Sequence, residues 1–319
     1  MSNVVKRFLR AKDTYLHNTP IQSLMRTELV NILESYLQSM PHDARLHKVF
    51  MNTEMYVEGS KTLEFCKKTP DIITTKNINT LKKWYIPRIF EFGCRQGEFT
   101  QLLLEKLHFD EYICNDIYEY SLNICQKSIA KNAILKTCIF DMNELSSHKI
   151  SLQKFNLIAS NACLQWLDFS TTIPILIDML EYNGILLLGT FGIENFKEIR
   201  SITGFGLQYL FLQQIEQELK RYGIIITLQE KKYELQFENA LEVFRHLQKS
   251  GVNSLGEKNK DSGITATAQD SALQCSYECK MKNVVANPNY IKKSWLQDYE
   301  KRFSNKLTYH AIFILVRKK

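Results

Sequence analysis

The chain lacks the features that mark several common classes of protein. Its longest apolar stretches, such as residues 185–188, are far too short to span a bilayer. The segment from Met1 to Phe8 has no apolar core of the kind found in a secretory signal. P-loop and zinc-protease spacings are absent, and no internal repeat is visible. We therefore expect a cytoplasmic globular protein with no membrane segment.

The eight cysteines include no Cys-x-x-Cys pair. Cys275 and Cys279 are close in sequence, but no further His or Cys lies near them to complete a zinc site. Cys114, Cys138 and Cys163 occur in or beside apolar segments, where cysteine behaves as a small apolar residue. The spacing therefore predicts reduced thiols and no metal site.

Residues 89–100 are the most informative segment of the chain. A short apolar strand carries Glu91 near its end and enters a turn that contains Gly93 and Gly97, and a helix-forming segment follows at 101–107. Such a turn places backbone N–H groups at the carboxyl end of a strand, where α/β sheets bind nucleotide-like ligands. The spacing is not the dinucleotide pattern Gly-x-Gly-x-x-Gly. An acid here would repel a pyrophosphate but suits an ammonium or sulfonium, which favours S-adenosylmethionine over NAD. A tight turn without a ligand is the alternative for this segment alone.

Three further apolar segments also end in polar residues. Asp116 follows the next strand, 19 residues beyond Gly97, close to the distance at which a carboxylate binds ribose hydroxyls in doubly wound folds. Asp141 ends a third strand and Asn161 a fourth. A single acid in this position is usually only the N-cap of the next helix. Four in succession predict a ligand site along one edge of a sheet.

Strand and helix patterns alternate through the middle of the chain, which predicts an α/β doubly wound sheet. Strands are expected near 86–92, 111–116, 134–140, 155–161, 184–190 and 223–230, with a seventh at 307–316. Helices are expected from Pro20 to about Met40, over 170–182 and over 237–247. We divide the chain into an N-terminal lid and insertion (1–85, with the insertion at 42–85), a cofactor core (86–230) and a cap with the last strand (231–319), which includes a mobile loop at 256–287.

Charge is distributed unevenly along these parts. The first 90 residues hold 14 Lys and Arg against 8 Asp and Glu, residues 91–230 hold 11 against 17, and residues 231–319 hold 16 against 9. Basic segments thus flank an acidic core. This asymmetry fits an acidic partner, either a protein or a nucleic acid, although solvated lysines on helix faces would give the same counts.

Six segments together resemble one family, the malonyl-acyl-carrier-protein O-methyltransferases of biotin synthesis. They are residues 7–11 with Thr14, Tyr15 and Gln22; 91–97; 160–166; 190–196; 238–253; and 307–310. The resemblance implies a seven-stranded Rossmann-like methyltransferase sheet with an N-terminal helical lid and a cap inserted before the last strand. It also implies methyl transfer from S-adenosylmethionine to the free carboxylate of a malonyl group on an acyl carrier protein. The main departure is Arg95, where the family usually has glycine.

The resemblance assigns roles to particular residues. Glu91, Gly93 and Gly97 would hold the methionine end of the cofactor, and Asp116 the ribose. Further candidates are Asp141 and Met142 at the adenine, Asn161 beside the transferred group, Tyr15 in the lid, and Gln165, Trp166 and Arg245 at the substrate. Arg245 suits a carboxylate because a guanidinium binds it in a fork. Its alternative is a solvated helix arginine. Without the resemblance, Gln165 and Trp166 are more often core residues, and Tyr15 is more often a packing tyrosine.

Three other functions stay open from the sequence. A small-acid carboxyl methyltransferase of the trans-aconitate type shares Asn161, Gln165 and Trp166 and would need no protein partner. An RNA methyltransferase would explain the basic flanks, but the chain has no recognisable RNA-binding module, so a nucleic-acid partner is not expected. Arg95 also permits a non-catalytic assembly or interaction factor that keeps the fold.

Overall fold

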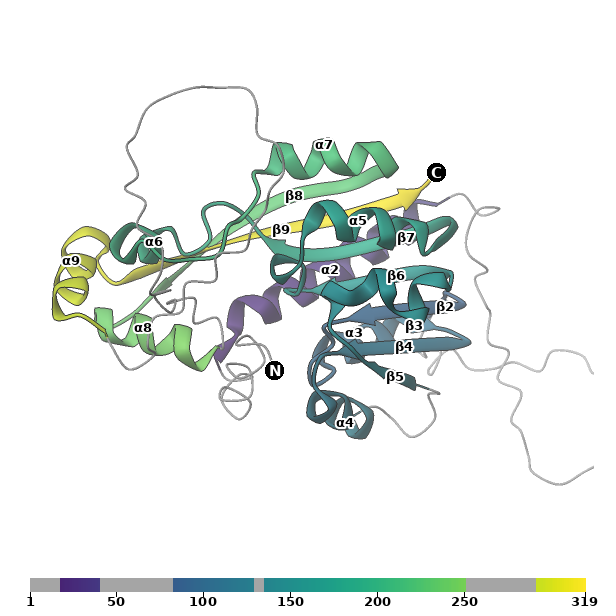
Figure 1. Cartoon of the computed structure of the whole chain (residues 1–319), viewed down its shortest axis with the longest axis horizontal. Helices are drawn as coiled ribbons and strands as arrows, with labels where there is room; N and C mark the ends of the chain where they lie inside the picture. The colour runs from purple at the N-terminus through teal and green to yellow at the C-terminus, as the bar shows by residue number, and fades with distance from the viewer. Residues whose placement is uncertain (1–17, 41–82, 129–134, 251–290) are drawn as a thin grey trace, which may run out of the picture.

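The computed structural model describes residues 18–40, 83–128, 135–250 and 291–319 (Figure 1). Most of the predicted insertion at 42–85, the loop at 256–287 and the lid residue Tyr15 lie outside these ranges. Among the described residues, no helix has both the length and the apolar character needed to cross a membrane.

Seven strands form one sheet in the order β5-β4-β2-β6-β7-β9-β8. The first five strands run parallel, and β9 is antiparallel to both of its neighbours. This order, with the last strand inserted between the sixth and the fifth, confirms the predicted Rossmann-like methyltransferase sheet. The bounds are β2 Arg88–Phe92, β4 Glu111–Asp116, β5 Leu135–Ile139, β6 Phe155–Asn161, β7 Leu180–Phe191, β8 Gly223–Gln236 and β9 Lys306–Lys318.

Helices cover both faces of the sheet (Figure 1). Successive strand residues point to opposite faces, so Ile89 joins one core cluster while Phe90 joins the other. The first cluster includes Leu29 of α2 and Leu103 of α3, and the second includes Ile173 of α5. The helices are α2 Pro20–Ser39, α3 Glu98–Lys106, α4 Glu119–Ser128, α5 Phe169–Asp178, α6 Lys197–Thr203, α7 Leu212–Tyr222, α8 Ala240–Lys249 and α9 Lys293–Phe303. Short elements are β1 Trp84–Tyr85, β3 Leu107–His108, η2 Met142–Ser147, η3 Lys149–Leu152 and η4 Leu164–Trp166.

Strands β8 and β9 continue beyond the other five, and α6, α8 and α9 gather around their extension (Figure 1). Helix α8 begins after Asn239, whose Oδ1 accepts a hydrogen bond from the backbone N–H of Glu242 at 3.0 Å. Helix α9 was not predicted from the sequence. The sequence pattern that indicates this helix is the recurrence of an aromatic residue at every fourth position, at Trp295, Tyr299 and Phe303. This spacing places the three aromatic side chains on one face of the helix, against the first core cluster.

Packing of α2 against the sheet gives a direct test of this fold. Leu29 is fully buried, whereas Leu24 on the same helix is 51% exposed. We expect Leu29→Ala to lower the free energy of unfolding by about 2–5 kcal/mol, because it leaves a cavity in the core. The matched Leu24→Ala should change it by less than about 1 kcal/mol. Urea denaturation measures both, and equal losses would contradict this packing of α2.

Candidate functional site

The turn between β2 and α3 is held in an unusual backbone conformation. Gly93, Arg95 and Gly97 have φ of 66°, 52° and 89°, all in the left-handed region. The backbone N–H of Cys94 donates to the carbonyl of Asn115 at 3.0 Å, which fixes the turn to the end of β4. The N–H of Gly97 donates back to the carbonyl of Cys94 at 2.9 Å. The turn is therefore tight and attached to the neighbouring strand.

Both glycines are also required by close packing. A Cβ added at Gly93 would lie 2.7 Å from the side chain of Cys163, and one at Gly97 would lie 2.8 Å from Cys125 Sγ. These distances are shorter than carbon and sulfur atoms allow without movement. The positions cannot carry a side chain in this conformation, so the turn presents bare backbone.

Asp116 ends β4 beside the turn and is 5% exposed. Its Oδ2 accepts from the backbone N–H of Arg95 at 2.9 Å, and its Oδ1 accepts from the N–H of Tyr118 at 3.0 Å. Burial raises the pKa of this carboxyl, while the Arg95 guanidinium and the backbone donors oppose the rise. Asp116 therefore links the turn to β4, and its role at the ribose stays a prediction.

Glu91 lies beneath the turn, on the sheet face that α3 covers. It points this way because it alternates with Phe90 and Phe92, which face the opposite core. Its Oε2 accepts from Thr100 Oγ1 at 2.7 Å and from the Tyr112 hydroxyl at 2.5 Å. These bonds connect β2 to α3 and β4. The prediction that Glu91 holds the cofactor stays untested, and the geometry favours a supporting role for it.

The buried carboxyl of Glu91 predicts a pH dependence of stability. It is 1% exposed, and desolvation raises its pKa from 4.5 to about 8 despite the two hydroxyl donors. A folded-state pKa above the unfolded value adds stability that is complete below about pH 4.5 and is lost as the pH rises through 8. We expect the wild-type free energy of unfolding to fall relative to Glu91→Gln by up to about 1.4 kcal/mol per pH unit across this window. Denaturation series at several pH values measure it, and parallel pH profiles would contradict a raised pKa.

The remaining strand ends approach the same region. Burial raises the pKa of the Cys163 thiol to about 12, the carboxylates of Asp116 and Asp141 add to this rise, and the Arg95 guanidinium opposes it. These groups are thus close enough to influence one another electrostatically. Asp141 caps η2 by accepting from the backbone N–H of Asn143 at 3.0 Å, and the following Met142 is buried.

Asn161 joins the end of β6 to α2. Its Nδ2 donates to the carbonyl of Gln22 at 3.1 Å. Its Oδ1 is buried and has no hydrogen-bond partner among the described residues, and the same holds for Gln22 Oε1. A buried amide oxygen without a donor is costly, so two of them together indicate a place where a ligand or another polar group belongs.

One of the two predicted substrate-wall residues lines a cavity between described parts of the chain. A cavity of about 50 Å³ lies between η4, β7 and the segment before α7. Gln165 lines it, with its Nε2 donating to the carbonyl of Ala162 at 2.7 Å, whereas the half-buried Trp166 is not among the lining residues. Gln208 and Tyr209 also line this cavity. The sequence gives no signal for them, because the segment 204–211 has no periodic pattern.

A buried polar network ties the cap to β9. His310 Nδ1 accepts from the backbone N–H of Glu194 at 3.1 Å, and the backbone N–H of His310 donates to Asn195 Oδ1 at 3.2 Å. The next residue along the strand toward the cap, Tyr309, bonds through its hydroxyl to His246 Nε2 of α8 at 2.7 Å. Three of the segments that carry the family resemblance, 190–196, 238–253 and 307–310, therefore meet in space.

Arg245 lies on the outer face of α8. Its side chain is 51% exposed, and its Nη1 pairs with Glu242 Oε1 at 2.5 Å. Phe244 and Leu247 on the same helix pack into the core. This placement matches the solvated-arginine alternative, and the substrate-clamp role stays a prediction.

Arg95 allows the strain of the turn to be measured. A residue with a Cβ in the left-handed region costs roughly 1–2 kcal/mol relative to glycine. We expect Arg95→Gly to raise the free energy of unfolding by about 1 kcal/mol, as measured by urea denaturation. Arg95→Ala is the matched control, because it removes the guanidinium but keeps the Cβ, and it should bring no such gain. Equal effects of the two substitutions would show that the backbone is unstrained.

Comparisons with known proteins identify relatives that share one name. The chain is 28% identical over 255 residues to a malonyl-[acyl-carrier protein] O-methyltransferase of Bacteroides thetaiotaomicron, covering 77% of this chain and 89% of the relative. It is 34% identical over 169 residues to the protein of the same name from Calditerrivibrio nitroreducens, covering 52% and 64%. The one from Bacteroides helcogenes aligns over 99% of this chain and 98% of its own, at 23% identity. These relatives carry the name of the family that the sequence resembles, so the matches confirm that resemblance.

No family model matches the chain. Among solved structures, a putative methyltransferase from Bacillus halodurans is similar with a TM-score of 0.45 and 10% identity, covering 72% of this chain and 91% of the other. The assignment of the fold rests on the strand order given above.

Proposed function

We propose that this relative of the malonyl-acyl-carrier-protein O-methyltransferases is a cytoplasmic, S-adenosylmethionine-dependent carboxyl O-methyltransferase. Its acceptor would be the free carboxylate of malonyl-acyl-carrier protein, and its product would enter biotin synthesis. One observation carries the proposal: the segments that resemble the family, although far apart in sequence, are joined by the network of Asn195, His246, Tyr309 and His310. The resemblance to the family therefore extends beyond the cofactor core (86–230) to helix α8 and strand β9.

The residues at the strand ends fit the cofactor. Gly93 and Gly97 form a tight turn in which a Cβ at either position would clash with Cys163 or Cys125. Asn161 Oδ1 and Gln22 Oε1 are buried acceptors without donors in the described structure. When bound, S-adenosylmethionine supplies an electrophilic methyl group on a sulfonium. Gly93, Gly97 and Asn161 would hold it together with Asp116, Asp141 and Met142, while Glu91 supports the turn from beneath.

The proposed reaction asks little of catalytic side chains. A malonyl carboxylate is ionised at neutral pH, so no general base is needed to activate it. The displacement brings a carboxylate to a sulfonium and cancels both charges, so exclusion of water and alignment of the two groups supply most of the rate. The residues of this chain would then orient the malonyl carboxylate toward the methyl group and exclude water from the site. The ester formed has lost its charge and resembles an ordinary apolar acyl chain.

The charge distribution supports a protein-bound acceptor. Net charge is positive before residue 91 and after residue 230, and negative between them. Basic flanks can attract an acidic carrier protein and bring its malonyl group to the acidic core, and added salt would screen this attraction.

A methyl-transfer assay tests the function directly. We expect purified protein with labelled S-adenosylmethionine to methylate malonyl-acyl-carrier protein, with kcat/KM falling as salt is added, and to leave trans-aconitate unchanged.

Asp116→Ala should weaken cofactor binding by about 1.5–3 kcal/mol, the scale of hydrogen bonds to a charged group, as measured by calorimetry. Asp110→Ala is the control, because Asp110 lies before β4 at the opposite edge of the sheet, where it accepts from Tyr85.

Other outcomes point to other functions. Turnover of trans-aconitate alone would indicate a small-acid methyltransferase, and failure to bind the cofactor at all would indicate a non-catalytic factor.

Arg245→Ala separates the two roles considered for that residue. A loss of turnover with cofactor affinity intact supports a substrate clamp, whereas wild-type turnover identifies a solvated arginine paired with Glu242.

A further inference from the structure

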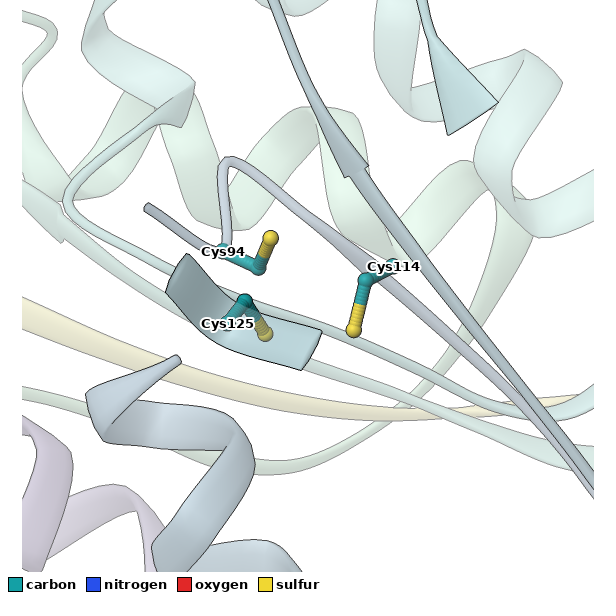
Figure 2. A group of neighbouring side chains, drawn as sticks. All are labelled: Cys94, Cys114 and Cys125. Atoms are coloured by element: carbon teal, nitrogen blue, oxygen red, sulfur yellow. The ribbon is translucent and has the colours of Figure 1, made fainter. Parts of the chain in front are cut away.

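Three cysteines that are far apart in the sequence meet beneath the turn. Cys94 belongs to the turn itself, Cys114 to β4 and Cys125 to α4 (Figure 2). All three are buried, and their sulfur atoms lie within 4.8 Å of one another. They are separated by 20 and 11 residues along the chain, so no spacing rule for metal ligands could have found them.

The cluster is in direct contact with the backbone of the turn. The position of a Cβ on Gly97 would be 2.8 Å from Cys125 Sγ, so this glycine rests on the cluster. Thr100 Oγ1 lies 3.9 Å from Cys114 Sγ and 3.7 Å from Cys125 Sγ, and it also donates to Glu91. A change at the three sulfurs is therefore transmitted to the turn through Cys94 and Gly97.

Charge limits what such a site can hold. A divalent ion on three thiolates leaves a net negative complex, which is costly because the three cysteines are buried. A trivalent ion on three thiolates is neutral. Soft sulfur ligands also prefer soft ions. The site therefore favours a trivalent, thiophilic ion that takes three sulfur ligands.

We propose that Cys94, Cys114 and Cys125 form a three-thiol binding site for a trivalent thiophilic species of the arsenite class. Arsenous acid would condense with the three thiols. Three As–O and three S–H bonds break, three As–S bonds form, and each thiol proton leaves with a hydroxide as water. Arsenic stays trivalent, so no oxidant or reductant is needed. Because the sulfurs are buried, uptake requires a local opening of the turn and should be slow.

The binding is tested on the full-length protein with sodium arsenite. We expect native mass spectrometry to show one arsenic per chain, and alkylation followed by peptide mapping to show protection of these three cysteines. Cys114→Ala and Cys125→Ala should each weaken uptake at least 10-fold, with cooperative thermal unfolding as the check that each variant is folded. Cys138→Ala on β5 is the matched control, and Cys66, Cys275 and Cys279 can be replaced together by alanine to remove other thiols. Neither replacement should change uptake.

Several results would overturn the site. The site is rejected if the protein binds no arsenic or if arsenite protects other cysteines from alkylation. It is also rejected if Cys114→Ala or Cys125→Ala takes up arsenite normally, or if replacing Cys66, Cys275 and Cys279 abolishes uptake. Stoichiometric binding of Zn²⁺ alone to the same three thiols, in preference to arsenite, would also overturn it in favour of a divalent site.

A second measurement rests on the proposed function, which places the cofactor on the turn. Three As–S bonds draw the sulfurs closer than unbonded thiols approach, and Cys94 carries the turn with it. We expect the arsenic-loaded protein to lose at least 10-fold in affinity for S-adenosylhomocysteine, and excess S-adenosylhomocysteine to slow the uptake of arsenite. Arsenic bound at the three thiols with unchanged cofactor affinity would refute the placement of the cofactor and leave the thiol site established.

Discussion

The attachment of the turn at 93–97 to β4 is the constraint on which the site depends. Two hydrogen bonds make it, from the N–H of Cys94 to the carbonyl of Asn115 and from the N–H of Arg95 to Asp116. They hold Gly93, Arg95 and Gly97 in the left-handed region. This conformation costs free energy at Arg95, which has a Cβ, so it persists only where the surrounding structure fixes the backbone. The bare backbone at the edge of the sheet follows from this attachment.

Support for the turn comes from below, from a small polar layer inside the core. Glu91 accepts from Thr100 and Tyr112, and the three thiols lie next to this carboxyl. Burial keeps the layer short of water, which strengthens each hydrogen bond within it and raises the pKa of Glu91 to about 8. The same layer thus sets the geometry of the turn and makes it sensitive to any change in charge or bonding beneath it.

The cap is attached to the sheet by polar bonds along β9. His310 binds the segment after β7, and Tyr309 binds His246 of α8. Burial lowers the pKa of His246 to about 4, so this histidine is neutral at physiological pH and its bond to the tyrosine hydroxyl involves no buried charge. One strand therefore serves both the core, by pairing with β7 and β8, and the cap.

The sequence by itself determined the seven strands, the turn and the polar strand ends, because these follow from periodicity and from residue types at fixed spacing. Only the tertiary structure decided where the side chains point. Strand alternation turned Glu91 into the core opposite to that of Phe90 and Phe92. The burial of Phe244 and Leu247 left Arg245 on the outer face of α8. Strand β4 and helix α4 brought Cys114 and Cys125 to Cys94. Contacts between residues distant in sequence leave no local pattern, since they depend on how strands and helices pack.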